Sequence, residues 1–301
     1  MKKVSAGVDI GGTNTVFGWV ESNGHFLWRG SIKTAQFSNP IDLVKEVSQQ
    51  LLNNLGEHEA IGLGIGAPNG NFFNGTVEFA PNLNWPNYVP LRDYFHHYFD
   101  MPVFVTNDAN ATALGEMVYG SAKGVKNFIM VTLGTGLGSG IVANGQLIYG
   151  HDAFAGELGH VIVEENGRLC GCGRRGCLET YASATAISRT AKELTSKEYS
   201  SSQVFEAAKE GHEWALQTFD FTAKKLGLAL ANAVAMTSPR KIYLFGGLAQ
   251  AGQLLFEPTK KYMEENLLSI YKGKVELLPS SLSGVDAAIL GASALAWKEI
   301  S

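Results

Sequence analysis

The stretch Val4–Trp28 reads VSAGVDIGGTNTVFGWVESNGHFLW. A first apolar run ends at Asp9-Ile10 and is followed by a Gly-Gly turn, a second apolar run, an Asn-Gly turn and a third apolar run. Short apolar runs separated by Gly and Asn-Gly pairs are typical of strands joined by tight turns. We therefore predict three consecutive strands, the first two joined by a Gly-rich turn and the last two by a hairpin.

The same order of elements returns at residues 128–149, which read FIMVTLGTGLGSGIVANGQLIY. Here the Gly-rich segment is Gly134–Gly140, a strand is expected at 141–143, and Asn144-Gly145 supplies the hairpin. A repeat of this length indicates two related halves. Each half then contributes one Gly turn, and we expect the backbone N–H groups of the two turns to face each other across a cleft.

The remaining elements are predicted from apolar spacing and from turn residues. We expect helices at 40–55, 91–99, 108–116, 184–194, 202–210, 213–236 and 254–266, and an Ala-rich amphipathic helix at 285–300. We expect strands at 60–66, 103–106, 241–245 and 275–279, and a long loop at 67–86. The predicted domains are residues 1–118, with helix 286–301 packing back on them, and residues 119–285.

Composition narrows the classes of function. The chain has 301 residues, a hydrophobic content of 45% and a net charge of −4, and no block of Lys or Arg stands out. This argues against a nucleic-acid or membrane-surface partner and favours small ligands. The longest apolar runs are too short to span a bilayer, and Met1-Lys2-Lys3 leads directly into a strand, so we expect a cytoplasmic protein.

The two Gly turns are suited to phosphate, because a turn without side chains exposes N–H donors and permits close approach. The alternating glycines at 134–140 lead into another strand, unlike a dinucleotide fingerprint, and no Gly-Lys-Ser/Thr follows a Gly-rich loop. A nucleotide such as ATP is the expected ligand. The alternative is that both turns are ordinary hairpins.

Two aspartates lie where a strand is predicted to end. Asp9, at the base of the first turn, could hold Mg²⁺ or its water between phosphates, or could only stabilise the turn. Asp108, within Asn107-Asp108-Ala109-Asn110-Ala111, lies at the carboxyl end of a strand, where ligands bind in open α/β sheets. By position alone, Asp108 could also be a helix N-cap.

All three cysteines of the chain, Cys170, Cys172 and Cys177, lie in one Gly-rich loop, and His160 precedes them. Three thiolates and one imidazole form a complete tetrahedral ligand set, which predicts a structural Zn²⁺ site. The alternative is three free thiols beside an unrelated histidine. Metal binding would also fix the flanking acids Glu157 and Glu179, making a rigid site suited to a polar ligand.

Five motifs together resemble the ROK family, which is named for repressors, open reading frames and kinases. They are Asp9-Ile-Gly-Gly-Thr13, Asn107-Asp108-Ala-Asn110-Ala, Gly134-Thr-Gly-x-Gly-x-Gly140, Glu157-x-Gly-His160 and Cys170-x-Cys-Gly-x-x-Gly-Cys177-x-Glu179. The resemblance covers nearly the whole chain. It implies an α/β, actin-like (ribonuclease-H-like) fold of two related domains around a cleft, with ATP as phosphoryl donor and a hexose as acceptor.

The resemblance also implies roles for individual residues. Asp108 matches the general base, and Asp9 matches the residue that serves Mg·ATP. The residues expected to contact the nucleotide are Gly11, Gly12, Thr13, Gly134, Thr135, Gly136, Gly138 and Gly247. Those expected to hold sugar hydroxyls are Asn107, Asp108, Glu157, His160 and Glu179. Asn69 departs from the commoner pattern, in which Gly follows the proline, and it adds a side chain near the sugar.

The family contains transcriptional repressors with a DNA-binding domain before the first Gly turn, but only eight residues precede Asp9. We therefore expect an enzyme rather than a sugar-sensing regulator. Glucose is the expected acceptor because the side chains named above offer no obvious apolar pocket for an acetamido methyl group. N-Acetylglucosamine, N-acetylmannosamine and fructose remain alternatives, and the resemblance suggests a homodimer or homotetramer.

Overall fold

The computed structural model describes residues 1–80, 82–282 and 284–300, and these form two compact units. Unit 1 comprises residues 1–125, 147–155 and 281–301, and unit 2 comprises residues 126–146 and 156–280. Ser301, the last residue of the predicted helix 286–301, lies outside the described residues. The predicted domains, residues 1–118 with helix 286–301 and residues 119–285, stay a prediction.

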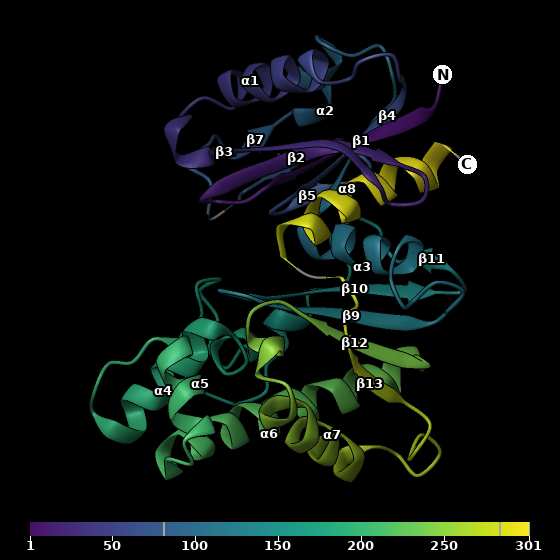
Figure 1. The fold of residues 1–301 in the computed structure, drawn as a ribbon. Coiled ribbons are helices and arrows are strands. Elements are labelled where there is room, and N and C mark those ends of the chain that lie inside the picture. The colour runs from purple at the N-terminus through teal and green to yellow at the C-terminus, as the bar shows by residue number, and fades with distance from the viewer. Residues whose placement is uncertain (81, 283, 301) are drawn as a thin grey trace. The chain divides into compact units, whose positions relative to one another are not determined.

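Unit 1 is built on a five-stranded sheet in the order β3-β2-β1-β4-β8 (Figure 1). The strands are β1 (Lys3–Ile10), β2 (Asn14–Glu21), β3 (Phe26–Lys33), β4 (Glu59–Ala67) and β8 (Val103–Asn107). The first three strands are antiparallel neighbours, whereas β4 and β8 run parallel to β1. The predicted strand-turn-strand-hairpin-strand order of the first 33 residues is confirmed.

Helices cover both faces of this sheet. They are α1 (Pro40–Asn53), α2 (Leu91–His96), α3 (Asp108–Val118) and α8 (Gly284–Ile300), with a 3₁₀ turn, η1, at Thr34–Gln36 (Figure 1). Alternate residues of β2 face opposite sides, since Phe17 and Trp19 join the core containing α1, whereas Val16 and Val20 pack against α8. The predicted loop 67–86 contains two short strands of a separate three-stranded sheet, formed by β5 (Gly70–Asn71), β6 (Thr76–Glu78) and β7 (Tyr88–Val89).

Helix α8 packs against the sheet with almost no space between the backbones. A Cβ on Gly7 would lie 2.1 Å from the carbonyl oxygen of Ile289, and one on Gly64 would lie 1.9 Å from that of Ala292. The prediction that this helix is amphipathic was wrong, because every residue of 289–296 is buried. Its small side chains let it contact β1, β2 and β4 on one side and α3 on another, so no broad face is left for solvent.

Unit 2 repeats the sheet order of unit 1 as β11-β10-β9-β12-β13. The strands are β9 (Phe128–Leu133), β10 (Leu137–Ala143), β11 (Gln146–Leu147), β12 (Lys241–Phe245) and β13 (Glu276–Pro279). β10 is antiparallel to β9, β12 is parallel to β9, and β13 is parallel to β12. The predicted repeat of two α/β halves is therefore confirmed. The second Gly turn is shorter than predicted, because β10 already begins at Leu137.

Four helices pack around the core of unit 2, namely α4 (Ala184–Thr195), α5 (Ser201–Lys209), α6 (Glu213–Thr237) and α7 (Gln253–Asn266). Short 3₁₀ turns, η2 (Leu158–His160), η3 (Leu178–Thr180) and η4 (Leu248–Ala251), lie between the regular elements. Helix α6 is buried on the face that packs on this core, whereas residues such as Leu216 and Met236 are exposed. Across the described residues, every helix falls short of the length or the hydropathy that a membrane crossing needs.

The buried carboxylate of Glu116 joins two segments of unit 1 by hydrogen bonds, the one that ends at Val125 and the one that begins at Ser281. Glu116, on α3, has no exposed surface, and its Oε1 accepts hydrogen bonds from both the N–H and the hydroxyl of Ser121 and of Ser281. The four donor–acceptor distances lie between 2.7 and 3.2 Å. Nothing in the sequence pattern around Glu116 had indicated this role.

We expect Glu116→Ala to lower the free energy of unfolding by about 2–4 kcal/mol, because it leaves several buried donors without an acceptor. Glu116→Gln should cost less, since an amide oxygen can still accept from some of them. Urea unfolding of both variants measures this. The matched control is Glu206→Ala on the exposed side of α5, where loss of a surface ion pair with Lys209 should cost about 0.5 kcal/mol or less. Equal effects of the alanine variants at 116 and 206 would contradict the role of Glu116.

Candidate functional site

The predicted site residues divide between the two units. Unit 1 holds Asp9, Gly11, Gly12, Thr13, Asn69, Asn107 and Asp108. Unit 2 holds Gly134, Thr135, Gly136, Gly138, Glu157, His160, Cys170, Cys172, Cys177, Glu179 and Gly247. Each group gathers at the carboxyl ends of parallel strands or in the turns and loops that follow them, which is where ligands bind in open α/β sheets.

In unit 1, Asp9 and Asp108 lie at the ends of the two strands that flank β4 in the sheet, β1 and β8. Asp9 pairs with Gly66 of β4, and Asp108 follows the last residue of β8, the next strand. A Cβ on Gly66 would lie 3.2 Å from Asp9 Oδ1 and 3.6 Å from the Cα of Asp108. The glycine therefore leaves the space into which both acidic residues fit.

Both carboxyl groups have a raised pKa. Burial, together with the charge of Asp108, raises the pKa of Asp9 to about 7. Burial also raises the pKa of Asp108, against the opposing effect of hydrogen bonds from the backbone, while part of its side chain stays exposed. The raised pKa of Asp9 favours a proton or a cation beside it, and the raised pKa of Asp108 makes its carboxylate a stronger proton acceptor than an ordinary Asp.

Asn107, not Asp108, is the N-cap of α3. Its Oδ1 accepts a hydrogen bond of 2.8 Å from the N–H of Ala109, which leaves its Nδ2 group as a donor for a ligand. Asp108 Oδ1 accepts from the same N–H, also at 2.8 Å. Because Asn107 already caps the helix, the capping interpretation does not account for the acid at position 108.

The backbone conformation at residue 69 explains why Asn can stand where Gly is commoner. Its φ is +51°, in the left-handed region that Gly and Asn tolerate best. Asn69 Nδ2 donates to the carbonyl of Phe79 at 3.1 Å, which orients the amide and leaves its Oδ1 as an acceptor. The substitution of Asn for Gly thus preserves the turn while adding one acceptor.

The first Gly turn leaves two donors available. The N–H of Gly11 closes the turn on the carbonyl of Asn14 at 3.0 Å, whereas the N–H groups of Gly12 and Thr13 have no acceptor among the described residues. Gly12 also lines a cavity of about 280 Å³. The other lining residues are Thr34, Ala35, Phe37, Ser38, Asn82, Leu83, Asn84 and Trp85. The loop predicted to be functional therefore supplies one wall beside this turn.

The second Gly turn, in unit 2, follows the same plan. The N–H of Gly134 closes on the carbonyl of Gly136 at 3.0 Å, and those of Thr135 and Gly136 have no acceptor in the part of the chain that the structure describes. Gly138 lies inside β10 and donates to Thr132 Oγ1 at 3.2 Å, so its N–H is not part of the open turn. No described atom would lie within 4 Å of a Cβ on Gly134 or on Gly247, which follows β12, so both glycines face open space.

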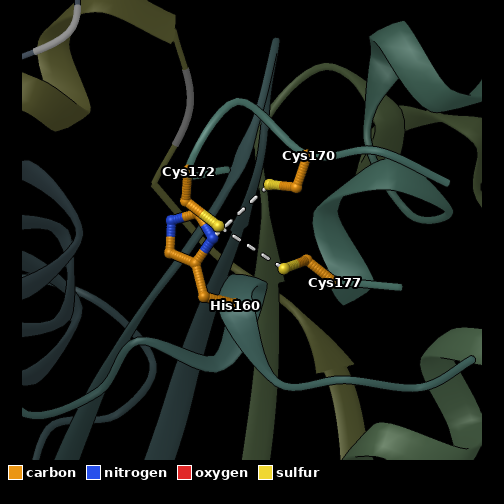
Figure 2. A group of neighbouring side chains, drawn as sticks. All are labelled: His160, Cys170, Cys172 and Cys177. Atoms are coloured by element: carbon orange, nitrogen blue, oxygen red, sulfur yellow. Dashed lines mark hydrogen bonds between the residues drawn. The ribbon is translucent and has the colours of Figure 1, made fainter. Parts of the chain in front are cut away.

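Figure 2 shows the four predicted metal ligands pointing toward one another. His160 comes from η2, and the cysteines come from the loop that precedes and includes the start of η3. One ligand atom from each of the four residues lies within 4.8 Å of all the others. The sulfurs of Cys172 and Cys177 are 3.6 Å apart, and Cys170 Sγ is 3.7 Å from His160 Nδ1.

These distances and this donor set fit Zn²⁺. Two sulfurs at about 2.3 Å from a tetrahedral ion lie about 3.8 Å apart, close to the observed separation. The N–H of Arg174 lowers the pKa of Cys172 to about 6, whereas burial raises the pKa of Cys177 to about 12, so a cation is needed for all three sulfurs to be thiolates together. Arg174 also donates to the carbonyl of His160 at 2.8 Å, which braces one ligand from outside the cluster.

Both flanking acids lie next to this cluster. His160 Nε2, on the side of the ring away from the sulfurs, is 3.9 Å from Glu157 Oε2. Glu179 Oε1 is 3.9 Å from Cys170 Sγ, and its Oε2 accepts a 2.9 Å hydrogen bond from the N–H of Leu137. The structure therefore joins the metal loop to the second Gly turn, a contact across 42 residues that local sequence patterns do not reveal.

Comparison with known proteins agrees with this arrangement. The model of the ROK family matches residues 5–299. A glucokinase of Thermotoga maritima is 36% identical over 310 residues, covering 98% of this chain and 97% of that protein. A xylose repressor of Bacillus spizizenii is 34% identical over 238 residues, covering 78% of this chain but 60% of that protein.

Among solved structures, a ROK family glucokinase from Streptomyces griseus, in complex with glucose and AMPPNP, superposes with a TM-score of 0.83. The two chains are 32% identical, and the match covers 98% of this chain and 99% of that one. The family resemblance and the actin-like fold predicted from the motifs are thus confirmed. The chain belongs to the ROK family.

Proposed function

We propose that the protein is an ATP-dependent hexokinase that phosphorylates glucose to glucose 6-phosphate. Full-length similarity to glucokinases, one of them solved with glucose and a nucleotide analogue, supports this function. The observation that carries the proposal is the place of Asp108, an acid at the end of β8 near Asp9, on a helix that Asn107 already caps.

Asp108 acts as the general base. Its carboxylate takes the proton from the acceptor hydroxyl while the oxygen of that hydroxyl attacks the γ-phosphorus of ATP and the bond to the β-γ bridging oxygen breaks. The raised pKa makes the carboxylate a stronger base than an ordinary Asp, and Asn107 Nδ2 is free to orient a hydroxyl beside it. A hydroxyl held in line reacts far faster than one that diffuses freely.

We propose that the open N–H groups of the Gly turns and the carboxylate of Asp9 contact the nucleotide. Gly12, Thr13, Thr135 and Gly136 each offer an N–H without an acceptor among the described residues, and Gly134 and Gly247 leave room for phosphate to approach. Asp9, whose raised pKa marks a site that favours a cation, would hold Mg²⁺ or one of its waters. When bound, Mg²⁺ supplies positive charge to the phosphate oxygens.

We propose that the hexose hydroxyls are held by the residues that the family resemblance implies, namely Asn107, Asp108, Glu157, His160 and Glu179, with Asn69 as an additional side chain near the sugar. Zinc on Nδ1 of His160 would leave the proton on Nε2, which then donates to a sugar hydroxyl or to Glu157. Three thiolates and one imidazole fill a tetrahedral site, so the zinc is structural.

An N-acetylhexosamine kinase or a fructokinase is the second candidate, because Asn69 changes one group near the predicted sugar site. A sugar-sensing regulator is the third, since the chain also resembles a xylose repressor over part of that protein's length. The two aspartates at the strand ends and the open turn donors favour catalysis over sensing. Assembly as a homodimer or homotetramer stays a prediction.

We expect Asp108→Asn to lower kcat by about 100-fold or more while glucose affinity changes little. The amide oxygen can still accept from the N–H of Ala109, and Asn107 still caps α3, so the fold should be kept. Steady-state kinetics and circular dichroism of the two proteins test this. A variant with near-wild-type kcat would exclude Asp108 as the base.

Removal of zinc should disable sugar binding before it disturbs the rest of the protein. We expect about one zinc per chain by elemental analysis, and Cys172→Ser should lower that content and raise the KM for glucose. The control is Ser196→Ala, remote from the cluster in sequence, which should keep the zinc. Fully active protein without metal would contradict the zinc site.

A panel of acceptors at fixed Mg·ATP tests the sugar. Glucose should exceed N-acetylglucosamine, N-acetylmannosamine and fructose in kcat/KM by at least about tenfold, which corresponds to about 1.4 kcal/mol. Asn69→Gly keeps the left-handed backbone and removes the extra acceptor, so a change in the order of the sugars would assign specificity to that side chain. A tenfold preference for either acetamido sugar would overturn the choice of glucose.

A further inference from the structure

The second Gly turn and the metal loop share one carboxylate. Glu179 stands in η3, two residues after Cys177, and its Oε2 accepts from the N–H of Leu137 at 2.9 Å. Its other oxygen lies 3.9 Å from Cys170 Sγ. The hydrogen bond from the turn is therefore the shortest polar contact that orients this partly buried side chain.

Because Gly136 has no side chain, it leaves the space that the carboxylate of Glu179 occupies beside the turn. A Cβ built on Gly136 would lie 2.2 Å from Glu179 Oε2 and 3.2 Å from its Cδ, far inside van der Waals contact. By contrast, a Cβ on Gly134, two residues earlier in the same turn, would meet no atom within 4 Å. The two glycines thus have different reasons to lack a side chain, one facing Glu179 and one facing open space.

The N–H groups of the turn also differ in whether they have an acceptor in the protein. Those of Thr135 and Gly136 have no acceptor among the described residues and are available to a phosphate, whereas that of Leu137 is already given to the carboxylate. A backbone N–H is a directional donor, so it fixes the plane and position of the carboxyl group that accepts from it.

We propose that this turn serves both substrates: Gly134, Thr135 and Gly136 contact the nucleotide, and the N–H of Leu137 positions Glu179 for the hexose, with Gly136 leaving the required space. This inference rests on the proposed function, since it takes Glu179 to be a sugar ligand. It makes Gly136 and Leu137 positioning residues for the acceptor, although they belong to an element that would otherwise be assigned to ATP alone.

The first experiment measures glucose affinity by calorimetry without nucleotide. Gly136→Ala should weaken glucose binding by about tenfold or more, because the new methyl group displaces the carboxylate and costs its hydrogen bond. Gly134→Ala should change glucose affinity by less than about twofold and should raise the KM for ATP instead. Wild-type glucose affinity in Gly136→Ala, with zinc still bound, would overturn the proposal.

The second experiment is a double-mutant cycle on thermal stability, which does not depend on activity. Gly136→Ala should lower Tm in the wild-type background but not in Glu179→Ala, where the obstructing carboxylate is gone. If Gly136→Ala fails to fold, recovery of the folded protein in Gly136→Ala/Glu179→Ala supports the contact. An equal loss of Tm in both backgrounds, or failure of both proteins to fold, overturns it.

These outcomes separate this inference from the proposed function. A wild-type protein that neither binds nor phosphorylates glucose would refute the function, and the stability cycle would still report whether Gly136 and Glu179 interact. Conversely, an active glucose kinase whose Gly136→Ala and Gly134→Ala variants bind glucose equally well would keep the function and refute the positioning role of the turn.

Discussion

Backbone N–H donors without protein acceptors impose the main chemical requirement on this molecule. Each Gly turn closes with one internal hydrogen bond, from Gly11 in unit 1 and from Gly134 in unit 2, and leaves the next two N–H groups open. Such donors are poorly satisfied unless water or an anion reaches them. Because the two units share one sheet order, the same arrangement arises twice, each time at the end of a first, central strand.

The two Gly turns differ in the acidic side chains that lie beside them. In unit 1, Asp9 and Asp108 stand at the ends of β1 and β8, the two strands that flank β4, and burial together with the charge of Asp108 raises the pKa of Asp9, which favours a cation there. In unit 2, the carboxylate of Glu179 is brought to the turn by the metal loop and takes the N–H of Leu137. One turn thus stands beside a pair of carboxyl groups, and the other donates an N–H to a single carboxylate. The repeated sheet order places open N–H groups in both units, and the acids beside them differ.

Local patterns predicted much of this structure and failed where contacts are distant in sequence. Hairpin and strand signals placed the sheets of both units, because tight turns and strand periodicity depend on neighbouring residues. The pattern for α8 misled, since an Ala-rich helix buried between a sheet and another helix needs no polar face. The acceptor role of Glu116 and the contact of Glu179 with Leu137 depend on tertiary packing, and no local spacing encodes them. The four residues of the metal cluster could be predicted because its cysteines lie close together in the chain.

The metal cluster lies in a segment that has little regular structure and yet carries several polar side chains of the predicted site. Between His160 and Glu179 the described backbone has only isolated β-bridges, Ile162 with Cys177 and Leu169 with Arg175, apart from the short turns η2 and η3. A segment with so few ladder hydrogen bonds is costly to order unless another interaction restrains it. A Zn²⁺ ion on these four ligands would supply that restraint and would leave no coordination position for water. His160 Nδ1 lies 3.7 Å from Cys170 Sγ and its Nε2 lies 3.9 Å from Glu157 Oε2, so an ion held by the sulfurs would also fix the geometry of the His160–Glu157 pair.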